Sequence, residues 1–187
     1  RKWLDERVVA SNYEEYFIVY NLGIDGDTSE GILKRIENET KPRVWRGEET
    51  VIMIAAGTND SMVNNKTNHF KISEKKYKEN LSKIFKIAKK YTGNVLFLGE
   101  HPIDEAKVNP IPWLKEYSYK TVHIKKFDEI SKKVCKEKDV YFIDLYSKLE
   151  KANFKEMLVD GVHFNNEGHE MIFKIIKDFL VENKIIC

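Results

Sequence analysis

The chain has 187 residues, and its 32 Lys and Arg residues nearly balance its 30 Asp and Glu residues, for a formal net charge of +2. This length favours a single domain over residues 1–187, with room for a substantial core. So small a net charge gives no reason to expect nucleic acid or an anionic membrane as a partner. No apolar run approaches the ~20 residues of a membrane span, so none is expected.

The two cysteines are poorly placed for a structural disulfide bond. Cys135 lies in a predicted helix and Cys187 is the last residue, which favours a reducing compartment. The first residues carry no signal-like pattern of a basic segment followed by an apolar one. Together these observations predict a cytoplasmic protein.

In chain order, the first half alternates between helix and strand. Apolar residues over positions 3–8 indicate the end of a helix, and Phe17–Tyr20 predicts a strand. Asp27 or Thr28 is expected to cap the next helix. The unbroken apolar run Val51–Ala56 predicts a strand that is buried on both faces.

The second half continues the alternation. Val95–Leu98 predicts a third strand, which is buried, and Val140–Ile143 predicts a fourth strand. Apolar residues at helical spacing predict three helices, over residues 73–88, 123–134 and 171–179. Strands separated by helices favour a parallel sheet with helices on both faces, which is a three-layer α/β/α fold. Sites in such sheets form beyond the carboxyl ends of the strands.

Three short motifs follow predicted strands or precede the last helix: Asn21–Thr28 (NLGIDGDT), Gly57–Asp60 (GTND) and Asp160–His163 (DGVH). In this order they resemble three of the four sequence blocks of the GDSL/SGNH serine hydrolases. The resemblance implies a flavodoxin-like parallel sheet with strand order 2-1-3-4-5. The fourth block, a Gly-Asp-Ser that ends the first strand and supplies the nucleophile, does not occur in the sequence. We therefore expect the first strand to be missing from this chain.

The last motif has the residues that a serine nucleophile needs. A serine hydroxyl requires a general base, and the base requires a partner that fixes its tautomer. His163 is the candidate base, and a tight turn at Gly161 would let Asp160 reach its Nδ1 atom. Taken alone, the pattern favours a helix-capping aspartate beside a surface histidine. Its position before the final helix, where the family keeps it, favours catalysis.

The resemblance also implies an oxyanion hole, in which N–H groups stabilise the negative charge of the transition state. Its donors would be the backbone N–H of Gly26 and the side-chain amide of Asn59, together with the N–H of the serine. Gly26 alone could be a turn glycine, with Gly23 as its rival for the donor role, and Asn59 alone could cap its loop.

Three more polar residues of these motifs are expected to tie the loops together rather than to catalyse: Asn21, Asp27 and Asp60. A metal site built from Asp160, His163 and His169 lacks the spacing of known ligand sets. No metal and no cofactor are therefore expected.

Two other histidines are interpreted as structural or incidental. His101 lies in an irregular, Pro-bearing stretch that extends to Trp113, and His123 lies on an apolar helical stripe.

The function that these residues favour is cleavage of small acyl esters by Ser-His-Asp chemistry. The nucleophile would lie in a segment of roughly 25–30 residues before Arg1, enough for a strand, a loop and the start of a helix. Two alternatives remain open. One is a non-catalytic member of the fold that binds a ligand or a partner, and the other is an O-acyltransferase that passes the acyl group to a sugar or another alcohol.

Overall fold

The computed structural model describes residues 2–12, 14 and 16–186. Its α-helices are α1 (Lys2–Ala10), α2 (Ser29–Thr40), α3 (Glu74–Ala88), α4 (Glu105–Val108), α5 (Thr121–Lys138), α6 (Leu145–Glu150) and α7 (Asn166–Glu182). Two 3₁₀ helices are η1 (Lys41–Arg43) and η2 (Phe154–Met157). The strands are β1 (Val51–Ala55), β2 (Val63–Asn64), β3 (Asn94–Leu98), β4 (Tyr117–Ser118) and β5 (Tyr141–Ile143).

The main sheet consists of three parallel strands in the order β1-β3-β5. Ala55 of β1 lies opposite Leu98 of β3, and Leu98 lies opposite Ile143 of β5. Because these three residues end their strands, the carboxyl ends of all three meet at one edge. The short strands β2 and β4 form a separate antiparallel pair, with Val63 opposite Ser118.

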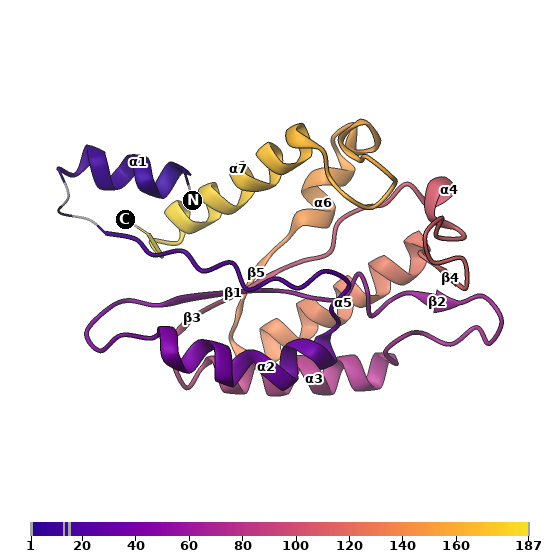
Figure 1. Ribbon diagram of the computed structural model, residues 1–187, viewed down its shortest axis with the longest axis horizontal. Helices are drawn as coiled ribbons and strands as arrows, with labels where there is room; N and C mark the ends of the chain where they lie inside the picture. Colours follow the sequence, from indigo (N-terminus) through magenta and orange to yellow (C-terminus); the bar gives the residue numbers. More distant parts are fainter. Residues whose placement is uncertain (1, 13, 15, 187) are drawn as a thin grey trace.

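Helices cover the sheet in two layers (Figure 1). Helices α2, α3 and α5 lie on one face, and the core on this face includes Tyr77 and Phe85 of α3 and Phe97 of β3. Helices α6 and α7 lie on the other face, where Leu145 and Ile175 pack against β3 and β5. This arrangement confirms the predicted three-layer α/β/α class.

Several helices begin at residues that suit an N-terminus. The side chains of Ser73, Asp144 and Asn165 each accept a hydrogen bond from the backbone N–H three residues later, which satisfies a donor that the helix leaves unpaired. Helix α2 follows Thr28, whose side chain makes no capping bond. None of the helices in the described ranges is both long enough and apolar enough to cross a membrane.

The predicted strand over Phe17–Tyr20 is wrong. These residues lie in no helix or strand, and Ile18, Val19 and Tyr20 are about half exposed. Their residue types favour strands, but a strand persists only when its backbone groups pair with a neighbour. In the order 2-1-3-4-5 its neighbour would be the first strand, which is expected to be missing from this chain, and among the described residues β1 pairs with β3 alone.

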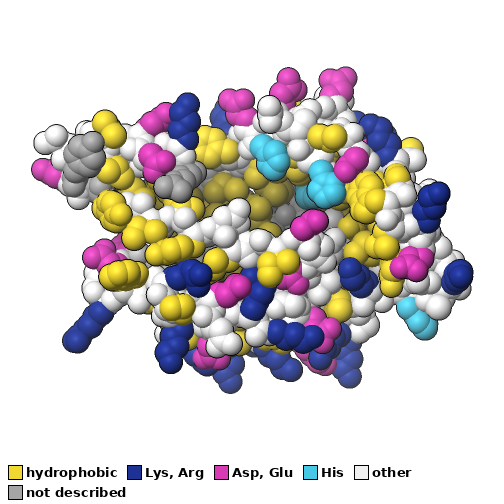
Figure 2. All heavy atoms as spheres, viewed as in Figure 1, with side chains coloured by type: hydrophobic (Ala, Val, Ile, Leu, Met, Phe, Trp, Pro, Cys, Tyr) yellow, Lys and Arg dark blue, Asp and Glu magenta, His cyan; other side chains and the backbone are white. Residues whose placement is uncertain are grey.

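The prediction that Val51–Ala56 is buried on both faces is also wrong. Ile54 faces the layer of α2 and α3 and is buried, whereas Met53 faces the opposite side and is 40% exposed. Met53 is exposed because β1 is an edge strand, whereas α7 packs against β5 at the other edge of the sheet. Figure 2 shows a hollow lined with apolar side chains on the α1 and α7 side of the sheet, with two histidines beside it.

Candidate active site

The loop between η2 and α7 carries Asp160 and His163 in a turn that is fixed by its surroundings. The N–H of Asp104 donates a 2.8 Å hydrogen bond to the carbonyl of Gly161. Gly161 has φ of +103°, and a Cβ there would lie 2.8 Å from the Cβ of Lys107. The turn therefore needs glycine at this position.

Within this turn, Asp160 holds the His163 imidazole in one orientation. One carboxylate oxygen accepts the N–H groups of Val162 at 3.0 Å and His163 at 2.9 Å, and the other lies 2.6 Å from Nδ1 of His163. Burial alone would raise the pKa of Asp160, but the bonds from His163 and Val162 lower it below the ordinary value. An ionised carboxylate can only accept, so Nδ1 carries a proton, and in the neutral imidazole the lone pair lies on Nε2. The His163 side chain is 62% exposed, so that lone pair can meet a substrate.

Aromatic side chains surround His163. The indole of Trp113 lies 5.7 Å from the imidazole, between ring centroids, with 35° between the planes, and it is 53% exposed. On the inner side, His101 packs edge-on against Phe164 at 4.7 Å. Burial lowers the pKa of His101, and the proximity of His163 lowers it further. His101 therefore lies beside the candidate site as a neutral ring.

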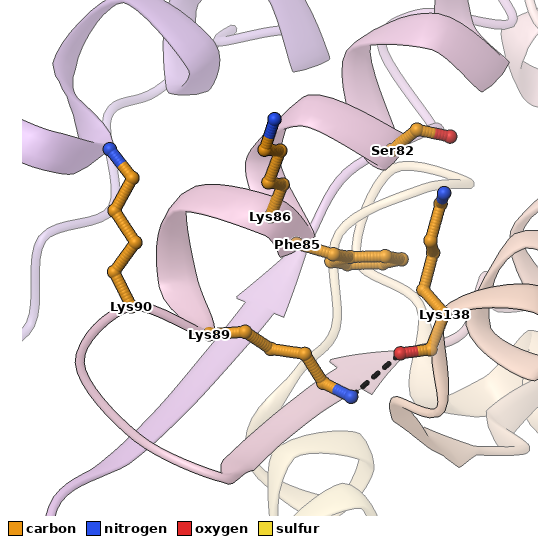
Figure 3. A pocket seen from close by; sticks show the side chains of 6 residues that line it. All are labelled: Ser82, Phe85, Lys86, Lys89, Lys90 and Lys138. Atoms are coloured by element: carbon orange, nitrogen blue, oxygen red, sulfur yellow. Dashed lines mark hydrogen bonds between the residues drawn. The ribbon is translucent and has the colours of Figure 1, made fainter.

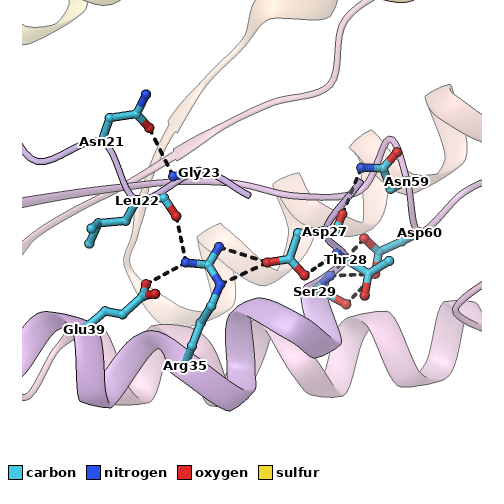
Figure 4. Close-up of polar contacts among 10 residues, drawn as sticks. All are labelled: Asn21, Leu22, Gly23, Asp27, Thr28, Ser29, Arg35, Glu39, Asn59 and Asp60. Carbon is cyan, nitrogen blue, oxygen red and sulfur yellow. Dashed lines mark hydrogen bonds and ion pairs between the residues drawn. The ribbon is translucent and has the colours of Figure 1, made fainter. Parts of the chain in front are cut away.

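The loop after β1 is anchored by the fully buried carboxyl group of Asp60. It accepts the backbone N–H of Ser29 at 3.1 and 3.0 Å and also the Ser29 hydroxyl. Asn80 donates to the same hydroxyl at 3.0 Å. Burial raises the pKa of Asp60, although the bonds from Ser29 oppose this. Asp60 thereby joins the strand-end loop to the first residue of α2, as Figure 4 shows.

Glu100 also contacts the loop after β1. The Thr58 hydroxyl donates to its carboxyl group at 2.5 Å, and its own N–H donates to Asp128 at 2.8 Å. Gly57 has φ of +130°, and a Cβ there would lie 1.8 Å from Oε1 of Glu100. Burial raises the pKa of Glu100 well above its usual range, and the nearby Asp128 adds to the effect.

The side-chain amide of Asn59 is held between two partners. Its Nδ2 donates a 2.8 Å hydrogen bond to the carbonyl of Asp27, and its Oδ1 accepts one of 2.7 Å from the Tyr119 hydroxyl. A primary amide has two N–H bonds, and within the described ranges the second has no acceptor.

Asp27 and Arg35 fix the segment that leads into α2 (Figure 4). Arg35 pairs with the Asp27 carboxylate at 2.9 and 3.0 Å and with Glu39 at 2.6 Å. It also donates to the carbonyl of Leu22 at 2.7 Å. The other oxygen of Asp27 accepts the N–H of Thr28 at 2.8 Å.

Gly26 and Asn21 lie on the exposed part of this segment. Gly26 has φ of +68° and open space where a Cβ would stand, and its N–H has no hydrogen-bond acceptor among the described residues. Asn21 makes only a local bond, in which it accepts the N–H of Gly23 at 3.0 Å. Asn21 is thus not tied to Asn59 or His163.

Tyr119 links the two halves of the candidate site. Burial raises the pKa of Tyr119, and the charges of Glu100 and Asp160 raise it further. Its phenol therefore lies near carboxyl groups of both loops. No serine hydroxyl among the described residues is hydrogen-bonded to His163.

Sequence reasoning missed Tyr119, Trp113 and Glu100. Tyr119 stands 60 positions from Asn59, outside every motif, so no local signal connects them. Trp113 ends the irregular stretch that the sequence analysis left without a role. Glu100 is the second residue after a predicted strand, and a carboxyl group at that position was a usable signal of a site residue.

A separate concavity of about 340 Å³ lies where α3 and α5 end, at the amino ends of the strands. Figure 3 shows its lining of Ser82, Phe85, Lys86, Lys89, Lys90 and Lys138. Lys89 donates to the carbonyl of Lys138 at 2.7 Å, and Lys90 pairs with Glu37 at 2.9 Å. Lysines are favoured at helix carboxyl ends, so their gathering here has a structural cause, and the concavity is no part of the candidate site.

Similar structures show the same fold. The lipase/acylhydrolase from Enterococcus faecalis matches with a TM-score of 0.71 and 22% identity, over 96% of this chain and 83% of that one. The acetyl xylan esterase AlAXEase matches with a TM-score of 0.72 and 17% identity, over 96% and 89%. TesA matches with a TM-score of 0.67 and 19% identity, over 96% and 85%. No curated protein matches the chain in sequence.

The family comparison covers most of the chain. The model of the GDSL-like lipase/acylhydrolase family matches residues 1–171, which include all three motifs at the carboxyl edge of the sheet. The parallel sheet, these motifs and this match together show that the chain belongs to the GDSL-like lipase/acylhydrolase family.

Proposed function

We propose that the protein is a serine hydrolase that cleaves small acyl esters. His163 acts as the general base, Asp160 orients it, and Gly26 and Asn59 donate to the oxyanion. The observation that carries this proposal is the 2.6 Å contact between Asp160 and Nδ1 of His163, which leaves Nε2 outside this contact on a side chain that is 62% exposed. The unused N–H of Asn59 and the unpaired N–H of Gly26 support the assignment of the two donors.

The nucleophile would come from a strand that is not among the residues of this chain and that ends in Gly-Asp-Ser. The free edge of β1 and the exposed face around Met53 support this part of the proposal. A parallel strand at that edge would lie ~4.8 Å from β1. Its carboxyl end would then reach the same edge of the sheet as Asn59 and His163.

In the proposed reaction, the serine hydroxyl transfers its proton to Nε2 of His163 while its oxygen attacks the ester carbonyl. The carbonyl oxygen becomes negative and is stabilised by the donors at Gly26 and Asn59. His163 then gives the proton to the leaving alcohol, and water releases the acyl group in a second round. The reaction uses no metal and no cofactor.

The acceptor distinguishes hydrolysis from acyl transfer. An O-acyltransferase would need to keep water from the acyl-enzyme, and it would form a new ester instead of a free acid. Similarity to an acetyl xylan esterase supports acyl esters as the substrate class. The non-catalytic alternative predicts another residue at the serine position.

The test is an acyl-chain-length panel of p-nitrophenyl esters with the complete protein. We expect hydrolysis that is fastest with short acyl chains and that is lost in His163→Ala. A folded protein that cleaves no ester of the panel would contradict the proposed function.

A further inference from the structure

The amide of Asn59 is the one candidate oxyanion donor whose orientation depends on a side chain from a distant part of the chain. Its nitrogen faces the carbonyl of Asp27 at 2.8 Å, and its oxygen faces the hydroxyl of Tyr119 at 2.7 Å. These two contacts leave the second N–H of the Asn59 amide without an acceptor among the described residues.

We propose that Tyr119 is a positioning residue that orients and polarises the Asn59 amide as an oxyanion donor. The inference rests on the proposed function for its catalytic consequence. Tyr119 itself touches neither substrate nor reacting atoms in this scheme.

The contacts define which end of the amide is nitrogen. A backbone carbonyl can only accept, so the Asn59 atom that faces Asp27 must be Nδ2. The atom that faces Tyr119 is then Oδ1, and the hydroxyl must donate to it. The terminal torsion of asparagine is soft. With only its bond to the carbonyl of Asp27, the amide would therefore be free to rotate about that contact. The bond from Tyr119 removes this freedom.

Tyr119 is itself well fixed. Its side chain is 5% exposed within a cluster that includes Met62 and Val162. Its backbone N–H donates to the carbonyl of Val108 at 3.0 Å. Burial and nearby carboxyl groups raise the pKa of Tyr119, so the phenol keeps its proton and remains a donor at any working pH.

The bond to Oδ1 also affects the free N–H. Donation to an amide oxygen draws electron density from the nitrogen, so the remaining N–H becomes a stronger donor. A stronger donor matters most when the substrate oxygen becomes negative, in the transition state. Loss of the Tyr119 hydroxyl should therefore lower kcat and leave KM unchanged.

The test compares Tyr119→Phe with Tyr117→Phe in the complete protein. Tyr117 lies two residues away in β4, and its hydroxyl makes no hydrogen bond among the described residues, so it is a matched control. We expect kcat of Tyr119→Phe to fall about ten-fold, less than the ~10²–10³-fold loss of a whole oxyanion donor, with KM unchanged. Tyr117→Phe should retain the original kcat and KM.

A double-mutant cycle separates positioning from packing. If Tyr119 acts through Asn59, Tyr119→Phe should cause no further loss of kcat in an Asn59→Ala background. Losses that multiply across the two substitutions would overturn the proposal.

A second readout does not depend on activity. The side-chain NH₂ signals of Asn59 in a ¹⁵N-labelled protein, assigned by their disappearance in Asn59→Ala, should shift in Tyr119→Phe and stay in place in Tyr117→Phe. Unchanged signals in Tyr119→Phe would overturn the positioning role. If the original protein cleaves no ester, the proposed function fails, and these signals alone decide whether Tyr119 orients the amide.

Discussion

At the scale of single residues, Asp160 and His163 depend on a turn that fixes their geometry rather than on the strength of their ion pair. Exposed ion pairs stabilise a fold by only about 0–1 kcal/mol, and the His163 side chain is 62% exposed. Substitution of either residue should therefore affect the reaction much more than the fold.

His163→Ala should abolish ester turnover, because the proposed reaction assigns the serine proton to this imidazole alone. Asp160→Asn should lower kcat by up to about 10⁴-fold, since an amide can donate to Nδ1 and so favour the wrong tautomer. Steady-state kinetics of the complete protein measures both effects. Thermal unfolding at near-original temperatures would exclude misfolding as the cause, and full activity of His163→Ala would contradict the assigned base.

Asn59→Ala should remove an interaction that exists only when the oxyanion forms. We expect a loss of ~2.7–4 kcal/mol in transition-state stabilisation, seen in kcat with little change in KM. A variant with an elevated KM and an unchanged kcat would instead assign Asn59 to substrate binding.

Glu100 gives a prediction for stability against pH. Its pKa in the folded protein lies well above the ordinary value of 4.5 because it is buried, so the folded state holds a proton that the unfolded state releases above that pH. The contribution of Glu100 is fully present below about pH 4.5 and is lost as the pH rises toward its folded pKa. Asp128, whose pKa burial raises to about 6, adds to the same trend.

Glu100→Gln should therefore become more stable relative to the original protein as the pH rises from 4.5 to 8, as measured by urea unfolding at each pH. Glu105→Gln is a control of opposite sign. The backbone N–H of Thr121 lowers the pKa of Glu105, so that substitution should destabilise at neutral pH and matter less in acid. A stability difference for Glu100→Gln that does not change with pH would contradict the raised pKa of the buried Glu100 carboxyl group.

At the scale of elements, the contact between Asp60 and Ser29 joins the loop after β1 to helix α2. Asp60→Ala would leave the buried N–H of Ser29 without its acceptor, and we expect the free energy of unfolding to fall by about 1–3 kcal/mol. Asp25→Ala, which removes an exposed carboxylate from the same region, is the matched control. Equal unfolding midpoints for the two variants would show that the Asp60 anchor does not stabilise the fold.

The sequence predicted those elements whose signal is local and repeated. Helices α2, α3, α5 and α7 and strands β1, β3 and β5 all follow from apolar spacing and turn residues. Helix α6 has six residues and β2 and β4 have two each, which is too short for a periodic pattern. Phe17–Tyr20 fails for another reason, since its strand propensity has no paired neighbour to act on.

The candidate site was predictable only where the motifs are short and contiguous. Asp160 and His163 stand three positions apart, so a turn brings them together. Tyr119 reaches Asn59 through tertiary packing across 60 positions, and Trp113 reaches His163 in the same way. Such contacts leave no trace in local spacing.

At the scale of the whole molecule, the free edge of β1, the exposed face around Met53 and the hollow in Figure 2 lie on the side of the sheet where the proposed strand would pair. The proposed segment should complete the sheet beside β1, and its terminal serine should meet Nε2 of His163.

The most direct measurement of this central claim is covalent labelling of the complete protein with a fluorophosphonate, followed by peptide mass spectrometry. We expect a single adduct on a serine preceded by Gly-Asp, upstream of Arg1, and we expect labelling to be lost in His163→Ala because the serine then lacks its base. An adduct on another residue, or labelling that His163→Ala leaves unchanged, would contradict the proposed serine hydrolase.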